Sequence, residues 1–473
     1  MEEHNDPHGA GARSILVLLA SHWISMAGVA LVTLAGFSWI FVLPTNLRGQ
    51  VENPYIGLLI FVAIPIVFFS GLILIPIGIA LGKRRIASQL AALPDRRTAF
   101  RRAAIFFAVM TGANLIIGSQ VSYKAVEHMD TVQFCGQSCH VMKPEFTAHL
   151  QAPHQQVACA SCHIAPGTTG WLKGKMSGTR QLMEVIFNSF PRPIESALAS
   201  NRLVSSTETC EQCHARQKYI GPRLRVTTKF APDQSNSRTE TVLTMLVGGG
   251  ALGGIHGAHM GPGVQIRYAA MDKQRQMIPW VEYRNSASGA VRTYVTADAK
   301  GASALPVFEM QCADCHNRAA HRFEDPDAAV DQALASGQID ASLPFVKKTG
   351  VELIKASYQT DADAEQRIPA GLAAFYRQSN PDVATQRSSA IQAAGAALLA
   401  IYQRNVFPDL RVTWGTYLNN LGHIDTPGCF RCHDGGHSTA TGQTITQDCD
   451  TCHKVVAVDE ASPEVLKTIG IAH

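Results

Sequence analysis

Charged side chains are absent from three stretches of this 473-residue chain, at residues 14–47, 53–82 and 103–123. Each stretch reaches the ~20 predominantly apolar residues that a helix needs to cross a bilayer. Three such runs exclude an ordinary water-soluble protein. We therefore expect transmembrane helices at about residues 14–43, 56–82 and 103–123. The first run is too long for the apolar part of a signal peptide and is followed by no small-residue cleavage site, so we interpret it as a retained anchor.

The loop at residues 83–102 gives the orientation in the membrane. It holds seven basic residues against the single acid Asp95. By the positive-inside rule this loop is cytoplasmic. The prediction is an inner-membrane protein with a cytoplasmic tail at 1–13, a membrane domain at 14–125 and a periplasmic remainder. The same loop accounts for the basic balance, because the net charge is +4 and all other residues sum to −2. This excludes nucleic acid as a partner.

No cysteine lies outside six short pairs. Five pairs read C-x-x-C-H, and the first along the chain, "CGQSCH", has one residue more between its cysteines. In such a motif two thiols on one turn bond the vinyl groups of a haem, and the next imidazole lies under the iron. We number the motifs 1 to 6: Cys135, Cys139 and His140; Cys159, Cys162 and His163; Cys210, Cys213 and His214; Cys312, Cys315 and His316; Cys429, Cys432 and His433; Cys449, Cys452 and His453.

Zinc, disulfides and a dinucleotide are the alternatives to haem. A zinc site needs two half-sites to converge and does not explain a histidine after every second cysteine. Disulfides inside such tight pairs would close tiny loops and stabilise little. The glycine motif "GGGALG" at 248–253 lacks a strand–turn–helix context. We expect six c-type haems, motif 1 included, because a decayed site would be expected to lose a cysteine and this one retains both.

Haems that only pass electrons usually have both axial positions filled, so the other histidines beyond the membrane are candidate distal ligands. An ordinary hydrogen-bonded histidine is the alternative for each of them. The terminal His473 is an unsuitable candidate, and His22, alone in the membrane segments, has no partner for a b-type haem. The best placed candidates are His154, His256, His259, His321, His423 and His437.

The predicted fold is mainly α, with three transmembrane helices before a periplasmic multihaem domain of helices and loops with a few short strands. Apolar residues recur at helical spacing in residues 343–358, 364–378 and 383–407. Short strands ending in turn residues are expected at 264–272, 278–284 and 291–297. Motif spacing divides the periplasmic part into a dihaem domain at 126–200 and a tetrahaem region at 201–473.

The segment "CGQSCHVMKPEFTAHLQAPHQQVACASCH" resembles the first two haem sites of the NapC/NirT family of membrane-anchored quinol dehydrogenases. The resemblance covers residues 126 to about 190. It implies that Met142, two residues after the motif histidine, ligates the first iron. It also implies that Lys175 lies at a quinol pocket. The acidic residue of related proteins falls on Leu182 here, and Glu184, two residues beyond, is the candidate for its role.

Family members typically have one transmembrane helix and four haems, whereas this chain has three predicted spans and six motifs. Its later segments "CADCHNRAAHRFEDPDAAVDQAL" and "TWGTYLNNLGHIDTPGCFRCHDGGHSTATG" resemble longer inner-membrane multihaem cytochromes that carry electrons from menaquinol outward. The resemblance implies oxidation of membrane quinol and transfer to soluble periplasmic cytochromes or a respiratory complex. One alternative is a catalytic multihaem reductase, although no motif here ends in lysine as in nitrite-reducing forms. The other is an electron-wire subunit of a larger respiratory complex.

Overall fold

The computed structural model describes residues 22–46, 63–84, 87–88, 96–214, 221–248, 253–299 and 304–470. The predicted cytoplasmic tail, the middle of the glycine motif and His473 lie outside these residues. The chain divides into two compact units, Met1–Met142 and Lys143–His473. Each is described by itself.

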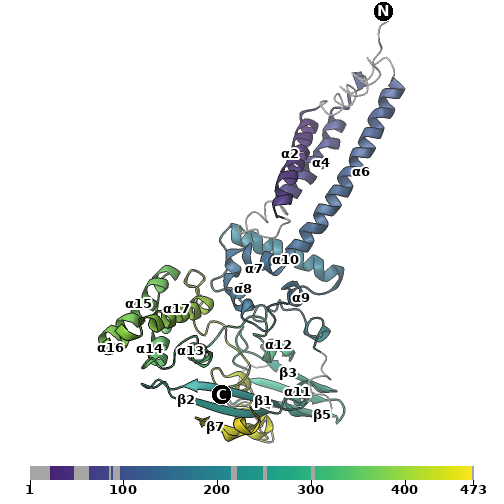
Figure 1. Cartoon of the computed structure of the whole chain (residues 1–473). Helices are drawn as coiled ribbons and strands as arrows, with labels where there is room; N and C mark the ends of the chain where they lie inside the picture. Colours follow the sequence, from purple (N-terminus) through teal and green to yellow (C-terminus); the bar gives the residue numbers. More distant parts are fainter. Residues whose placement is uncertain are drawn as a thin grey trace, which may run out of the picture. The chain divides into compact units, whose positions relative to one another are not determined.

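The first unit is helical and begins with two closely packed helices. Its elements are α2 (Trp23–Asn46), α4 (Ile64–Leu81), α6 (Arg96–Met129), α7 (Val132–Gln137) and the 3-10 helix η2 (His140–Met142). Helices α2 and α4 lie side by side (Figure 1). A Cβ atom added to Gly28 would stand 2.7 Å from the carbonyl oxygen of Gly71, and one added to Gly78 would collide with Ser25. Small residues therefore allow the two backbones to approach, as is common between membrane helices.

One described helix, α4, is long and apolar enough to cross a membrane, with a mean hydropathy of 2.5. The other two predicted spans also fall on helices, α2 and α6. Their described apolar parts, Trp23–Ser38 and Ala104–Gln120, are shorter than a full span. Helix α6 also extends at both ends beyond the predicted 103–123 segment, from the basic residues at Arg96 to Met129.

The second unit contains two antiparallel sheets. One has the order β1 (Arg223–Phe230), β2 (Arg238–Met245), β7 (His453–Glu460). The other has the order β5 (Ala290–Val295), β4 (Trp280–Asn285), β3 (Val264–Ala269), β6 (Val307–Glu309). The three strands predicted between residues 264 and 297 are confirmed as β3, β4 and β5. The first sheet was not predicted, so the described chain is more mixed than the expected mainly α fold.

A cluster of twenty buried apolar residues is centred on a bundle of five helices. These are α13 (Pro326–Ala335), α14 (Val346–Lys355), α15 (Asp361–Ser379), α16 (Pro381–Gln386) and α17 (Ser388–Asn405). The helices predicted from apolar spacing are confirmed, and the last is divided in two at Arg387. Inside the bundle the Lys347 ammonium lies 2.7 Å from the Asp331 carboxylate, and both side chains are buried or nearly so.

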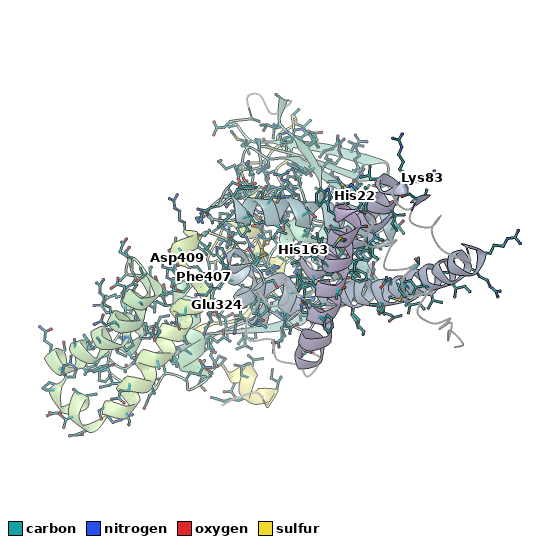
Figure 2. All side chains as sticks on the ribbon, turned by 90° about the horizontal axis from the view of Figure 1, so that it is seen from above. His22, Lys83, His163, Glu324, Phe407 and Asp409 are labelled. Atoms are coloured by element: carbon teal, nitrogen blue, oxygen red, sulfur yellow. The ribbon has the colours of Figure 1, made fainter. Side chains whose placement is uncertain are left out.

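The bundle is tied to the segment that follows motif 4. Arg404, near the end of α17, donates to the Glu324 carboxylate at 2.6 Å, and the Asn405 side chain accepts from the Glu324 backbone N–H at 2.8 Å. Figure 2 labels Glu324 beside Phe407 and Asp409, which follow α17. These contacts hold the end of the histidine-containing segment 316–324 against a rigid core.

The remaining elements of the second unit are short and mostly surround the cysteine motifs. They are α8 (Lys143–Leu150), α9 (Ala160–His163), α10 (Gly167–Ile186), η3 (Cys210–Gln212), α11 (Gly254–Met260), α12 (Cys312–Cys315), η7 (Pro408–Leu410), η8 (Gly428–Arg431), η9 (Cys449–Thr451) and α18 (Glu464–Thr468).

Candidate haem-binding sites

The five C-x-x-C-H motifs each form a single tight turn. In motif 2 the backbone N–H groups of Cys162 and His163 both donate to the carbonyl of Cys159, at 3.2 and 3.0 Å. Motifs 3 and 5 repeat both hydrogen bonds, and motifs 4 and 6 each show one of them. Residues three apart on such a turn lie on the same side, so both thiols point the same way. None of the twelve cysteines forms a disulfide, and no three His, Cys, Asp or Glu residues among the described residues converge as a metal cluster.

Motif 1 absorbs its extra residue in a helical turn. Cys135 belongs to α7, and Cys139 follows one turn later, just past the helix end. Residues four apart on a helix also share a face, so the wider spacing still places both thiols on one side. The Thr131 hydroxyl caps α7 by accepting from the Phe134 N–H at 3.1 Å. His140 and Met142 are the first and last residues of η2.

Five motif histidines face a second histidine from another part of the chain. The five pairs lie at nearly equal distances. Their ring-centre separations are 6.1 Å for His163 and His321, 5.8 Å for His214 and His154, 6.2 Å for His316 and His256, 5.8 Å for His433 and His259, and 6.1 Å for His453 and His423.

This spacing fits a metal ion bound between two imidazoles. A metal–nitrogen bond of about 2 Å and a further ~1 Å from nitrogen to ring centre, counted on both sides, separate the ring centres by about 6 Å. Rings stacked face to face lie closer, as His423 and Phe430 do at 4.2 Å. Each pair also lies beside two thiols on one turn. The residues present therefore fit a c-type haem at motifs 2 to 6.

Helix α11 supplies two of these histidines. His256 and His259 are three residues apart and so lie on the same side of the helix. The start of α11 is anchored to the end of β2, because the Ile255 N–H donates to the Leu246 carbonyl at 2.9 Å. Gly254 has φ +70° at this junction, and a Cβ there would stand 2.6 Å from that same carbonyl. The glycine-rich sequence thus lets the helix begin close to the sheet.

Motif 2 lies in a cluster of three histidines, His149, His163 and His321 (His163 is labelled in Figure 2). Burial, and then the neighbouring His321 and His149, lower the pKa of His163 to about 4, so its imidazole is neutral at physiological pH. His321 uses Nδ1 to donate to the Glu145 carbonyl at 2.9 Å. His149 uses Nδ1 on the Ala320 carbonyl at 3.0 Å, which leaves its buried Nε2 without a partner.

His149 was a candidate from the sequence but was not among the best placed ones. Its ring centre is 5.9 Å from that of His321, so His321 faces two histidines rather than one. A sequence signal existed, because His149 stands only ten residues before motif 2. It was indistinguishable from His154 and His128 without knowing which imidazoles are buried.

Residues 97–223 match the NapC/NirT cytochrome c family, N-terminal region. The cytochrome c-type protein ImcH of Geobacter sulfurreducens is 36% identical over 445 residues, which cover 92% of this chain and 87% of that protein. The chain belongs to the NapC/NirT family of c-type cytochromes. No solved structure matches it.

Membership of this family makes the protein a membrane-anchored, multihaem c-type cytochrome that transfers electrons between partners. Covalently bound haem follows from the same membership. The resemblance noted in the sequence around motifs 1 and 2 is therefore confirmed, and the family match also extends through motif 3.

His437 of the cytochrome differs from the other candidate ligands. Its side chain is 1% exposed. Nδ1 lies 2.9 Å from the Asp434 carboxylate, and Nε2 lies 2.6 Å from the Ile278 carbonyl. Both ring nitrogens are thus engaged by protein atoms, and neither is left to bind iron. This geometry favours a structural role for His437, which links the loop after motif 5 to the segment before β4.

Motifs 2, 3 and 4 of the cytochrome are neighbours in space. Burial raises the pKa of the Cys162 thiol, and the next largest influence is Cys210 of motif 3. The pKa of Cys210 is itself lowered to about 5, first by a hydrogen bond with Cys312 of motif 4. Consecutive attachment turns therefore approach within the range of direct thiol interactions.

Motifs 4, 5 and 6 continue the series. Arg431, inside motif 5, donates to the carbonyl of Asp314, inside motif 4, at 2.8 Å. The pKa of the Cys452 thiol in motif 6 is raised by burial and then by Cys429 of motif 5. Five of the six motifs thus form one continuous row in chain order.

Lys175 and Glu184, the candidate quinol residues, both lie on α10 but on opposite sides. Nine residues are two and a half turns, or about 180° around the axis and roughly 13 Å along it. Glu184 pairs instead with Arg180 at 2.9 Å. The Lys175 ammonium lies 5.7 Å from the ring centre of Trp171. The two side chains therefore do not face one pocket. Glu184 is not placed to accept a proton from a quinol bound at Lys175.

Proposed function

We propose that this cytochrome oxidises a membrane quinol, with menaquinol the expected one, at the periplasmic face. Electrons then pass through six c-type haems to a soluble periplasmic cytochrome or a respiratory complex. The observation that carries the proposal is the row of five motif turns, each with its histidine pair. A bound haem supplies one-electron redox chemistry at its iron. The chain's contribution is to hold successive sites close together, because electron tunnelling falls steeply with distance.

The proposed attachment sites are the twelve cysteines, and the proposed proximal ligands are the motif histidines. His321, His154, His256, His259 and His423 are the proposed distal ligands for motifs 2 to 6 in that order. Iron is bound by the neutral imidazole, and burial lowers the pKa of the motif histidines His163 and His316 and of the distal candidate His259. For motif 1 the proposed axial ligand is Met142, by resemblance to the family, in place of His140, which the extra residue between the cysteines shifts relative to the iron.

We place the protein in the inner membrane with three transmembrane helices, the N-terminus inside and all six motifs in the periplasm. The uncharged stretches and the basic loop at 83–102 support this topology. The close contact of α2 and α4 also supports it, because small residues at a helix interface are typical of membrane bundles. Covalent haem attachment outside the cytoplasm agrees with the same orientation.

The proposed quinol-binding residue is Lys175. Helix α10 has a stripe of exposed apolar side chains, formed by Trp171, Leu172, Met176, Met183 and Ile186. At 100° per residue these side chains cover less than half of the helix circumference, and Lys175 lies within that sector. A stripe of this kind on a membrane-anchored protein suits the lipid interface, where quinol enters. The Lys175 ammonium would donate a hydrogen bond to a quinone oxygen there. The alternative is that Lys175 only extends its ammonium to the lipid headgroups.

Lys173 is the matched control, because it is exposed on the same helix but lies outside the apolar stripe. The experiment compares Lys175→Met and Lys173→Met in purified cytochrome reduced by a menaquinol analogue. We expect the first variant to slow haem reduction at least tenfold with unchanged haem spectra, and the second to behave as wild type. Equal rates in both variants would favour snorkelling. Failure of the wild type itself to accept electrons from quinol would favour the electron-wire alternative.

A further inference from the structure

Phe430 stands between the two cysteines of motif 5, yet its ring packs against a proposed ligand of motif 6. The ring centres of Phe430 and His423 are 4.2 Å apart and their planes differ by 12°, which is a face-to-face stack. The His423 ring centre also lies 6.1 Å from that of His453 of motif 6. The His423 imidazole thus contacts the attachment turn of motif 5 and is also the proposed distal ligand of motif 6.

The His423 and His453 rings are also the most nearly parallel of the five pairs. Their planes differ by 23°. The other four pairs, at motifs 2 to 5, have interplanar angles of 55°, 64°, 41° and 57°. The orientation at motif 6 therefore differs from that of the rest of the row.

The usual device for orienting a ligand histidine is a hydrogen bond from its second ring nitrogen. His154, His259 and His321 follow this pattern, each placing Nδ1 at 2.7 to 3.0 Å from a backbone carbonyl. Within the described part of the chain, the His423 ring has no such hydrogen bond. It also follows Gly422, whose φ is +91°, in an irregular loop that does not fix the ring by helical geometry. The aromatic stack takes the place of the missing hydrogen bond.

We propose that Phe430 is a positioning residue that holds the His423 imidazole nearly parallel to that of His453. It thereby couples the geometry of the sixth haem site to the attachment turn of the fifth. This inference rests on the proposed ligand assignment for motif 6. Removing the stack should free the His423 ring to rotate about its Cβ–Cγ bond without removing either ligand.

The angle between two axial imidazole planes controls the splitting of the iron d orbitals. Nearly parallel and strongly crossed imidazoles therefore give different electron paramagnetic resonance spectra in low-spin ferric haem. A change of ring orientation is visible in this spectrum even when haem content and folding are unchanged. A merely structural role for Phe430 would not produce it.

The experiment uses the full-length, haem-loaded protein and three variants. His423→Ala identifies the spectral component of the sixth haem as the low-spin signal that it removes. Phe430→Leu keeps apolar volume but removes the stack, and Phe430→Tyr keeps the ring as the conservative control. We expect the leucine variant to shift that component toward the crossed-plane type and to move the midpoint potential of that haem, while the tyrosine variant retains the wild-type spectrum.

An unchanged component in Phe430→Leu would overturn the proposal while leaving the ligand assignment intact. A full low-spin signal in His423→Ala would overturn the assignment of His423 and the proposal with it. Quinol-dependent reduction of the other haems, measured on the same samples, keeps either failure separate from failure of the proposed function.

Discussion

Loss of a single distal histidine should convert one haem, and only one, from low spin to high spin. His259 provides the sharpest case. Its ring centre is 5.8 Å from that of His433, and its Nδ1 is held by the Ile255 carbonyl at 2.7 Å, so Nε2 is the nitrogen available to iron. His256, the nearest histidine on the same helix, already faces His316. No spare imidazole on α11 is therefore in place to substitute for His259.

The magnitude follows from the number of histidine pairs. With five such pairs of equal weight, His259→Ala should remove about one fifth of the bis-histidine low-spin ferric signal and create one high-spin haem. Removing an axial ligand should not detach the haem, because the thioether bonds to the Cys429 and Cys432 side chains remain. Spin quantitation by electron paramagnetic resonance or magnetic circular dichroism, normalised to total haem, measures this fraction.

His437→Ala is the matched control, since His437 is a buried histidine with both nitrogens bonded to protein. Its loss leaves the Ile278 carbonyl unpaired and should cost about 1–3 kcal/mol of stability. The spin state of every haem should stay the same. The reasoning is refuted if His259→Ala retains the full low-spin signal, or if His437→Ala loses part of it.

Three further predictions follow from individual contacts. Lys347→Met should lower the free energy of unfolding by about 3–5 kcal/mol, because it leaves Asp331 buried without its partner; a loss below 1 kcal/mol in chemical denaturation would contradict this. His321→Ala should create one high-spin haem and His149→Ala none, and the reverse result would make His149 the ligand at motif 2. Intact mass should show six haems in the wild type and incomplete attachment in Cys135→Ala, whereas five haems in the wild type would mean that motif 1 is empty.

Many elements of this cytochrome can be predicted from the sequence because they depend on local sequence patterns. The C-x-x-C-H spacing requires only one turn of backbone, and each motif turn is closed by hydrogen bonds among its own residues. The helices between Val346 and Asn405 follow from apolar periodicity, since one face of each helix must be buried in the bundle. Strands β3 to β5 follow from short runs between turns. Even the opposite placement of Lys175 and Glu184 is fixed once α10 is known to be one helix.

The sheet β1–β2–β7 required the tertiary structure. Strand β7 pairs with β2, and in that pairing His453 stands opposite Met245, more than two hundred residues earlier in the chain. The sequence near motif 6 does not indicate that β7 pairs with β2. Beta pairing satisfies backbone groups between segments that are distant in sequence, so a strand without strong alternation is recognised only when its neighbour is known.

The partners of the imidazoles were likewise decided by the tertiary structure. His437 and His423 flank the same motif, yet one is bonded through both nitrogens to protein and the other faces His453. A histidine has the same chemistry in either role, and its sequence neighbours do not distinguish them. What differs is the group that folding brings to each ring nitrogen: for His437 it is the carbonyl of Ile278, from a segment about 160 residues away.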